Sequence, residues 1–293
     1  MASASFSEYF KLLRVHQYPK NLFIFLPLFF ALKITRVELA FSALLSFIAF
    51  CMAASSVYIL NDIRDVEDDR QHPTKCKRPL ASGAISMKVA YIYFSCLILA
   101  SALLMGTLSF TGLAIIAFYL ILNVAYSIKL KHIAIFDVII IAIGFVLRLF
   151  VGSVVTAIPL SMWIVIMTFL LALFLALAKR RDDVIIFETT GKKMRKVIDG
   201  YNRTFLDNSM ILMAGIVIVA YIQYTVTDEI VERIGSRYLY FTAIFVLMGI
   251  LRYLQIAFVD ENSGSPSKVL LKDRFIQLTI VGWIATFTWI LYL

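Results

Sequence analysis

Long apolar stretches, separated by short polar segments, follow one another along almost the whole chain. A stretch of roughly 18–22 apolar residues is the length that an α-helix needs to cross about 30 Å of hydrocarbon. Membrane β-strands would instead alternate apolar and polar residues over about ten positions. The pattern predicts nine membrane helices, near residues 20–33, 40–61, 88–107, 109–126, 134–155, 160–178, 208–226, 238–258 and 275–293.

The composition agrees with this pattern. Of the 293 residues, 61% are apolar and only 16% are charged, whereas a soluble domain is about half apolar and about a quarter charged. The three cysteines have no metal-binding spacing, so they indicate neither a zinc site nor a disulfide framework. We therefore expect an all-α, polytopic bundle in which residues 1–293 form a single integral membrane domain.

The Lys and Arg residues are unevenly distributed among the connections between the predicted helices. With the N-terminus in the cytoplasm, 22 of the 28 lie on the cytoplasmic side and 4 on the opposite side, and the positive-inside rule predicts this orientation. Two cytoplasmic connections, 62–87 and 179–207, are rich in charge and are expected to cap a polar site. Nucleic-acid binding is not expected, because the basic residues lie beside the membrane and are mixed with carboxylates.

The first charged connection begins with NDIRDVEDD (residues 61–69), in which Asp62, Asp65 and Asp69 are spaced three and four apart. If the preceding helix continues past Leu60, the three carboxylates share one helical face. Like charges at this spacing repel one another unless a cation lies between them, and carboxylates with water and phosphate oxygens are the ligands of Mg²⁺. We expect these three residues to be the catalytic, metal-binding carboxylates. The alternative is a solvated loop in which Asp balances nearby Lys and Arg.

Basic residues follow these carboxylates directly. They are Arg70, His72, Lys75, Lys77 and Arg78. A carboxylate-bound metal ion beside such a cluster is typical of a diphosphate site, because Mg²⁺ bridges two phosphate oxygens while Arg and Lys neutralise the others. The stretch 61–83 therefore predicts a metal and diphosphate site at a membrane boundary.

The sequence NDIRDVEDD, extended by the overlapping run DRQHPTKCKRPLASG (residues 69–83), resembles the first aspartate-rich motif of the UbiA superfamily of intramembrane prenyltransferases. Nine predicted helices with two charged connections also resemble that family, so the resemblance covers nearly the whole chain. It implies a helical bundle with a central cavity open to the cytoplasmic side and Mg²⁺ bound with a diphosphate by the motif.

The second charged connection departs from the aromatic prenyltransferases of the superfamily, which usually carry a second aspartate-rich motif after the sixth helix. Here the chain reads LALAKRRDDVIIFET, with three bases at 179–181 followed by the adjacent Asp182 and Asp183. This departure counts against a prenyl diphosphate donor, and three bases at a helix end suit a phosphate group. The alternative is that these bases only anchor the helix by the positive-inside rule.

Other segments, among them LRVHQYPKNLFIFLPLFF, GFVLR and LFLALAKRR, are similar to a phosphoribosyltransferase branch of the superfamily. This resemblance implies Mg²⁺-dependent transfer of a 5-phosphoribosyl group from phosphoribosyl diphosphate to a decaprenyl-type polyprenyl phosphate, for cell-envelope glycan precursors in a bacterial plasma membrane. The residues expected to bind the substrates are Lys20, Asn61, Arg70, Lys75, Arg78, Tyr126, Lys129, Lys131, Asp137, Arg148, Lys179, Arg180 and Arg181.

Two intramembrane charges, Asp137 and Arg148, are eleven residues apart and share a helical face about three turns apart, too far to pair. Both are expected to face the bundle interior, because an unpaired charge in lipid is costly. Two alternative functions remain: an aromatic prenyltransferase with a polyprenyl diphosphate donor, and a transporter in which these residues and Arg252 mark an ion path. Most of the charge lies at the membrane boundary, which disfavours the transporter. A homo-oligomer is compatible with the sequence.

Overall fold

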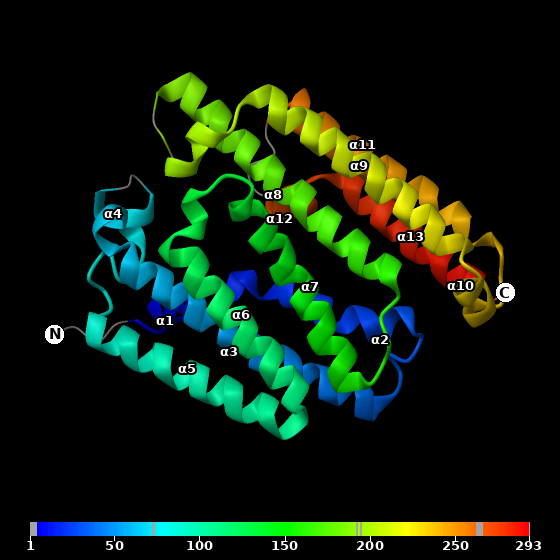
Figure 1. Ribbon diagram of the computed structural model, residues 1–293, viewed down its shortest axis with the longest axis horizontal. Coiled ribbons are helices and arrows are strands. Elements are labelled where there is room, and N and C mark those ends of the chain that lie inside the picture. Colours follow the sequence, from blue (N-terminus) through cyan, green and yellow to red (C-terminus); the bar gives the residue numbers. More distant parts are fainter. Residues whose placement is uncertain (1–4, 72–73, 192, 194, 262–265, 293) are drawn as a thin grey trace. The chain divides into compact units, whose positions relative to one another are not determined.

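The structure is a computed structural model that describes residues 5–71, 74–191, 193, 195–261 and 266–292, with the backbone alone at 266–268 and 291–292. Within these ranges every regular element is a helix (Figure 1). Seven segments are long and apolar enough to cross a membrane: α3 (Val37–Arg64), α5 (Met87–Leu108), α6 (Phe110–Ile128), α7 (Phe136–Thr156), α8 (Met162–Thr190), α9 (Arg203–Val226) and Tyr238–Phe258, which comprises η5 (Tyr238–Thr242) and α11 (Ala243–Phe258).

Shorter elements connect or flank these segments. They are α1 (Phe6–Leu13), η1 (Val15–Phe25), α2 (Leu26–Phe30), α4 (Val66–Gln71), η2 (Lys75–Lys77), η3 (Leu130–His132), η4 (Lys196–Gly200), α10 (Asp228–Ile234), α12 (Pro266–Lys272) and α13 (Arg274–Tyr292). The helix expected at 275–293 corresponds to α13, whose part described with side chains, Arg274–Ile290, is apolar.

The predicted spans from the second to the eighth are confirmed, but the predicted count of nine is not. The first expected span, 20–33, is instead the 3₁₀ segment η1 followed by the five-residue helix α2. Pro19 lies inside η1 and Pro27 opens α2, and proline lacks the N–H that an α-helix needs in its interior. Beyond α2, Leu32 has a left-handed backbone with φ of 57°, so the helix does not continue.

The second charged connection is shorter than the predicted 179–207, because α8 continues to Thr190. The charged end of α8 contains an ion pair between Arg180 Nη1 and Asp183 Oδ2 (2.5 Å), one helical turn apart, which stabilises the helix there. The helix ends where Gly191 adopts a left-handed backbone with φ of 68° and donates its N–H to the carbonyl oxygen of Phe187, a common helix C-terminal arrangement.

The chain forms two compact units, described separately below. Unit 1 comprises residues 1–128 and 144–160, and unit 2 comprises residues 129–143 and 161–293. The single domain over residues 1–293 stays a prediction.

In unit 1, α3 is the central helix and contacts α5, α6, η1 and α1. Many of its buried residues are small, which lets neighbouring backbones approach closely, as is typical of membrane helices; for example, Ser101 of α5 donates a hydrogen bond to the Ala49 carbonyl oxygen (2.7 Å). Helix α7 and η1 approach each other closely at Gly152. A Cβ atom on Gly152 would lie only 2.0 Å from the carbonyl oxygen of Ile24, so this position requires glycine.

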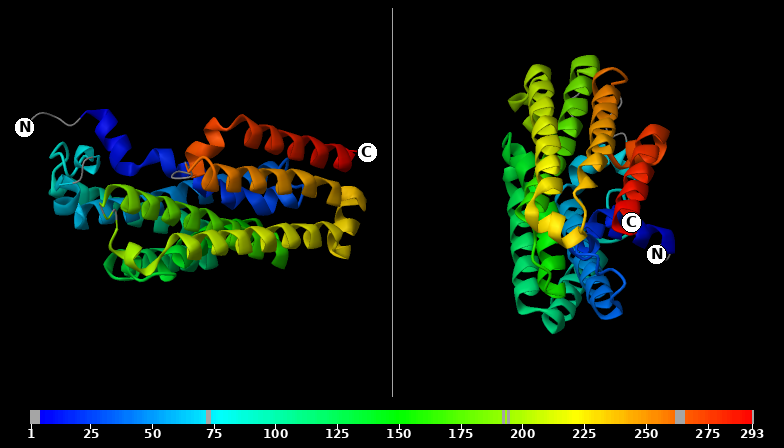
Figure 2. Two further views of the ribbon diagram at one scale, coloured as in Figure 1. Left: turned by 90° about the horizontal axis from the view of Figure 1, so that it is seen from above. Right: turned by 90° about the vertical axis from the view of Figure 1, so that its right-hand side faces the viewer.

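In unit 2, α8 packs along α9, and α11 packs along α13 (Figure 2). The buried Arg181 of α8 connects three of these helices. Its Nε donates to Asp207 Oδ1 of α9 (2.6 Å), and its Nη1 donates to the carbonyl oxygen of Ala257 in α11 (2.5 Å). A fully buried guanidinium with these partners joins α8 to both neighbouring helices.

Candidate active site

Two carboxylates of the predicted acidic motif converge on one arginine in unit 1. Arg78 Nη1 lies 2.6 Å from Asp69 Oδ2 and 3.1 Å from Asp62 Oδ1. Both carboxylates are almost completely buried, while the side chain of Arg78 is 27% exposed. The chain therefore points two carboxylate oxygens at one cationic position, next to a partly accessible base.

A second arginine contacts the same carboxylate. Arg14 Nη2 forms an ion pair with Asp62 Oδ1, and its guanidinium lies over the ring of Tyr58, 4.9 Å from the centroid. Tyr58 and Asp62 are four residues apart in α3, so they share a helical face. Arg14, which follows α1, and Arg78, which follows η2, thus contact the same carboxylate.

Contrary to expectation, Asp62, Asp65 and Asp69 do not lie on one continuous helix. Helix α3 ends at Arg64, and Asp65 is its C-cap with φ of −95° and ψ of 9°. Asp69 belongs to the separate helix α4, whose chain is joined to the cap by the hydrogen bond from the Asp69 N–H to the Asp65 carbonyl oxygen (2.8 Å). Asp62 of α3 and Asp69 of α4, which lie on two helices on either side of the cap residue Asp65, thus contact one arginine.

Other residues predicted for this site have different surroundings. Asn61 contacts the hydroxyl of Ser127 through its side-chain oxygen, which fixes the amide next to Asp62. Arg70 is exposed and pairs with Glu67 (2.7 Å), so it does not contact the site carboxylates. Lys75 lies in η2 and is partly buried, and His72 lies outside the described residues.

Arg148 is 5% exposed and lies deep in unit 1. Its Nε donates to Asn21 Oδ1 (2.7 Å), its Nη1 donates to the carbonyl oxygen of Gly144, and its guanidinium lies over the ring of Phe50 (4.7 Å). Asn21 in turn contacts Cys51 (3.0 Å), which is eleven residues before Asp62 and therefore about 17 Å from it along α3. Arg148 thus holds η1 against α7 at a level of the bundle that is far from the carboxylates along α3.

Lys20 of η1 lies outside the seven spans and is partly buried. Burial, together with the positive charges of Arg148 and Arg14, lowers the pKa of Lys20 to about 8.

Unit 2 contains a separate buried polar network. Arg180 is 1% exposed; its Nε donates to Asp137 Oδ2 (2.6 Å), and its Nη1 contacts Asp183. The Tyr201 hydroxyl donates to Asp137 Oδ1 (2.5 Å), and burial together with this hydrogen bond raises the pKa of Tyr201 above its usual value. Asp183 is also paired with Arg195 (3.4 Å). The predicted burial of Asp137 is confirmed, and its charge is balanced by Arg180.

The remaining predicted residues differ in their exposure. Lys179 and Lys129 are exposed, while Lys131 and Tyr126 are partly buried. Arg181 is buried in its contacts with α9 and α11.

Comparison with known proteins assigns the chain to a family. The model of the UbiA prenyltransferase family matches residues 22–279. The chain belongs to this family. A decaprenyl-phosphate phosphoribosyltransferase of Mycolicibacterium smegmatis is 32% identical over 94% of this chain and 90% of its own length. The enzyme of the same name from Mycobacterium tuberculosis is 33% identical over 94% of this chain and 91% of its own length.

A solved UbiA homologue from Archaeoglobus fulgidus, bound to DMAPP and Mg²⁺, has the same fold. It superimposes with a TM-score of 0.71 over 98% of this chain and 99% of that chain, at 18% identity. The UbiA-like, all-helical fold is therefore confirmed. With this family and seven apolar helices of spanning length, the chain is a multi-pass membrane protein.

The carboxylates of this UbiA family member fit a divalent cation. Asp62 and Asp69 already place oxygens within 3.1 Å of one cationic nitrogen of Arg78, and hard oxygen ligands of this kind suit Mg²⁺ when water and phosphate oxygens complete the shell. In the part of the chain that the structure describes, no group of three or more His, Cys, Asp or Glu side chains converges on one point. Asp65 as a third ligand therefore stays a prediction.

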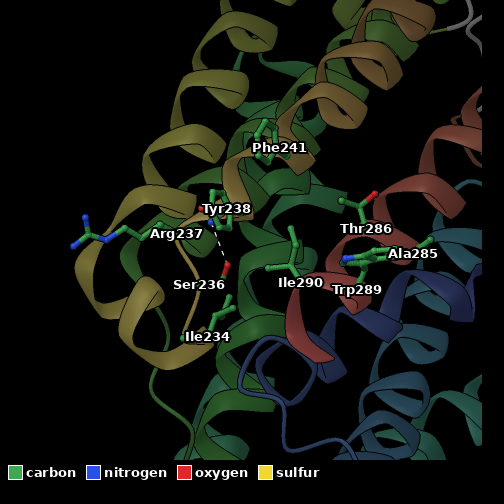
Figure 3. A pocket seen from close by; sticks show the side chains of 10 residues that line it. Ile234, Ser236, Arg237, Tyr238, Phe241, Ala285, Thr286, Trp289 and Ile290 are labelled. Carbon is green, nitrogen blue, oxygen red and sulfur yellow. Dashed lines mark hydrogen bonds between the residues drawn. The ribbon is translucent and has the colours of Figure 1, made fainter. Parts of the chain in front are cut away.

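A cavity of about 1050 Å³ lies elsewhere in unit 2, between the α10–η5 turn and the C-terminal part of α13 (Figure 3). Its lining is mainly apolar and aromatic, including Phe241 and Trp289, and contains none of the predicted site residues. It carries no carboxylate, so it lacks the groups that a metal and diphosphate site requires.

Arg14 and Tyr201 are not among the residues predicted for the site. Arg14 is 48 residues from Asp62 along the chain, and Tyr201 is 64 residues from Asp137. The available signal for Arg14 was its place in the basic segment LRVHQYPKN, directly before the first apolar run. Nothing in the local sequence indicates the partner of Tyr201.

Proposed function

We propose that this UbiA family protein transfers the 5-phosphoribosyl group of phosphoribosyl diphosphate to a polyprenyl phosphate and releases diphosphate. The observation that carries the proposal is the similarity, over 94% of the chain, to two proteins named decaprenyl-phosphate phosphoribosyltransferase. We further propose an N-terminus in the cytoplasm, because this orientation places 22 of the 28 Lys and Arg residues on the cytoplasmic side.

The donor diphosphate is assigned to the site formed by Asp62, Asp69 and Arg78. A divalent cation, which we take to be Mg²⁺, would be held by the carboxylates and would neutralise charge on the leaving diphosphate. Asp65 is retained as a proposed third ligand. Arg78 is partly exposed, so its planar guanidinium can form paired hydrogen bonds to phosphate oxygens. Lys75 lies close along the chain and adds a second positive charge.

The reaction needs no strong general base. The bond from ribose C1 to the diphosphate oxygen breaks, and the diphosphate leaves with the electron pair while the ribose passes through an oxocarbenium-like state. An oxygen of the lipid phosphate then forms the new bond to C1. Because this phosphate is already an anion, no proton has to be removed. The protein's contribution is therefore positioning and preorganised positive charge on the leaving group.

The two units differ in what their carboxylates can bind. Asp183 of unit 2 is already paired with Arg180 and Arg195, which disfavours the second metal site of a prenyl diphosphate enzyme. Direct substrate binding by Arg180 and Arg148 stays a prediction. Their burial and their protein partners favour positioning roles, with Arg148 holding the η1 segment that carries Lys20.

The experiment that tests this function uses ribose-labelled phosphoribosyl diphosphate, polyprenyl phosphate and Mg²⁺ with the purified protein in detergent. We expect label in the lipid extract and none after addition of EDTA. Asp69→Asn should reduce the rate about 100-fold or more, because a preorganised charge at the leaving group is lost. The matched control is Asp68→Asn, a neighbouring exposed carboxylate, which should retain activity.

Asp65→Asn distinguishes a third ligand from a helix cap. We expect it to abolish turnover while the protein still folds, and normal turnover would remove Asp65 from the metal site. If no label reaches the lipid but an aromatic acid is prenylated from a prenyl diphosphate, the proposed donor is wrong and the fold and metal site remain.

A further inference from the structure

One oxygen of Asp62 accepts hydrogen bonds from two arginines. Arg14 Nη2 and Arg78 Nη1 both contact Oδ1 of this carboxylate, which is 2% exposed. A carboxylate oxygen has two lone pairs, so both are used by guanidinium groups. A divalent cation that binds through this oxygen must therefore replace at least one of the two arginines.

The two arginines would be left with different partners if they released Asp62. Arg78 also contacts Asp69 Oδ2 at 2.6 Å, so it keeps a carboxylate partner if it leaves Asp62. Arg14 has Asp62 as its carboxylate partner among the described residues. Its side chain is 21% exposed, and it lies between α1 and η1 with a left-handed backbone (φ 52°). The Arg14 guanidinium also lies over the ring of Tyr58 in α3, and this contact does not require the Asp62 carboxylate.

We propose that Arg14 exchanges between Asp62 and the diphosphate of the substrate, so that the divalent cation and the diphosphate bind together. Arg14 would give up the Asp62 oxygen, which could then hold the divalent cation, and the released guanidinium would form charge-assisted hydrogen bonds to diphosphate oxygens. This inference rests on the proposed function for the presence of a diphosphate, and it adds Arg14 to the residues that contact the substrate.

The exchange has a thermodynamic consequence. Metal alone binds weakly, because displacing Arg14 leaves a guanidinium without an anionic partner. Diphosphate supplies that partner, so each ligand raises the affinity for the other by the same factor. Removal of the Arg14 charge should strengthen the binding of metal alone, weaken the binding of diphosphate, and reduce the coupling between them.

The test uses the full-length protein in detergent with Mn²⁺ and radiolabelled inorganic diphosphate as probes. The Kd for Mn²⁺ without diphosphate is measured from the electron paramagnetic resonance signal of the unbound ion. The Kd for diphosphate is measured by equilibrium dialysis with and without Mn²⁺. The variants are Arg14→Gln and Arg14→Lys. The matched control is Lys11→Gln, an exposed base of α1 that pairs with Glu8 (2.6 Å).

In the wild-type protein we expect Mn²⁺ to tighten diphosphate binding about tenfold or more, which is within the usual range of coupling between two ligands. In Arg14→Gln we expect Mn²⁺ to tighten it less than about threefold. Arg14→Gln should bind Mn²⁺ alone more tightly than the wild type, and Lys11→Gln should match the wild type in both measurements. An unchanged or weaker affinity of Arg14→Gln for Mn²⁺ alone would overturn the exchange. If Arg14→Gln is not recovered folded, Arg14→Lys decides by the coupling instead. Lysine keeps the charge but loses the planar guanidinium that pairs with diphosphate oxygens, so Mn²⁺ should tighten diphosphate binding less than in the wild type, and unchanged coupling would overturn the exchange.

Failure of the exchange and failure of the proposed function give different results. If inorganic diphosphate and Mn²⁺ show the expected coupling but phosphoribosyl diphosphate is not a substrate, the exchange stands and the proposed donor is wrong. If the wild type transfers phosphoribosyl groups but Arg14→Gln has wild-type affinity for Mn²⁺, the function stands and the exchange is wrong.

Discussion

Arg180 provides the sharpest test of whether the basic stretch 179–181 binds phosphate or stabilises the protein. The perturbation is Arg180→Gln. The guanidinium is 1% exposed and lies between Asp137 (2.6 Å) and Asp183 (2.5 Å). Without it, Asp137 is left fully buried with the Tyr201 hydroxyl but without a positive charge.

The expected magnitude follows from these contacts. Removing one partner of a buried ion pair lowers the free energy of unfolding by about 3–5 kcal/mol, because the other charge stays buried without compensation. For a chain of this kind each kcal/mol shifts the unfolding temperature by about 2–4 °C. We therefore expect Arg180→Gln to unfold at least about 6 °C below the wild type.

The assay is thermal unfolding in mild detergent, followed by the amount of monodisperse protein after heating. Lys179→Gln is the matched control, because Lys179 is the exposed neighbour in the same helix; its unfolding temperature should stay close to that of the wild type. The double variant with Asp137→Asn should be less destabilised than the sum of the two single variants, because the uncompensated carboxylate is removed. If Arg180→Gln instead unfolds at the wild-type temperature and loses donor binding, Arg180 is a phosphate ligand and our interpretation of the network is wrong.

Two further predictions concern packing and pH. In Gly152→Ala the new Cβ would lie 2.0 Å from the backbone oxygen of Ile24, so we expect a loss of about 3 kcal/mol in unfolding free energy; Gly215→Ala, with no atom within 4 Å, is the control and should not lower the unfolding temperature. A hydrogen bond from Arg252 lowers the pKa of Asp273, so the stability it confers is present at neutral pH and is lost as the pH falls through the folded-state pKa. Asp273→Asn should therefore lower the unfolding temperature at pH 7, and the difference from the wild type should shrink below about pH 4; a constant difference would contradict this assignment.

The membrane helices were the most predictable part of the fold, because an apolar run of sufficient length has few other stable structures in lipid. The end of α8 was not predictable in the same way. Its charged residues 179–183 look like a connection, and they remain helical because Arg180 meets Asp137, 43 residues earlier in the chain. A pairing over this separation depends on tertiary structure and leaves no periodic signal.

The carboxylates of the candidate site were predicted from their spacing, but their geometry was not. A continuous helix would have kept Asp62, Asp65 and Asp69 on one face, whereas α3 ends at Arg64 and only the first and third are seen to contact Arg78 among the described residues. The part played by Arg14 also depends on tertiary structure, because α1 must pack on α3 before its C-cap can reach Asp62.

The exposure of the arginines explains why two similar acid–base clusters are assigned different roles. Arg14 and Arg78 are 21% and 27% exposed, so each can exchange a carboxylate for a phosphate oxygen without leaving a charge buried and unpaired. Arg180 is 1% exposed, and its release would strand Asp137 in the protein interior. Because the cost of an uncompensated charge rises steeply with burial, exchange is feasible at the first cluster and opposed at the second. This difference, rather than the number of charges, places the proposed chemistry at Asp62 and Asp69.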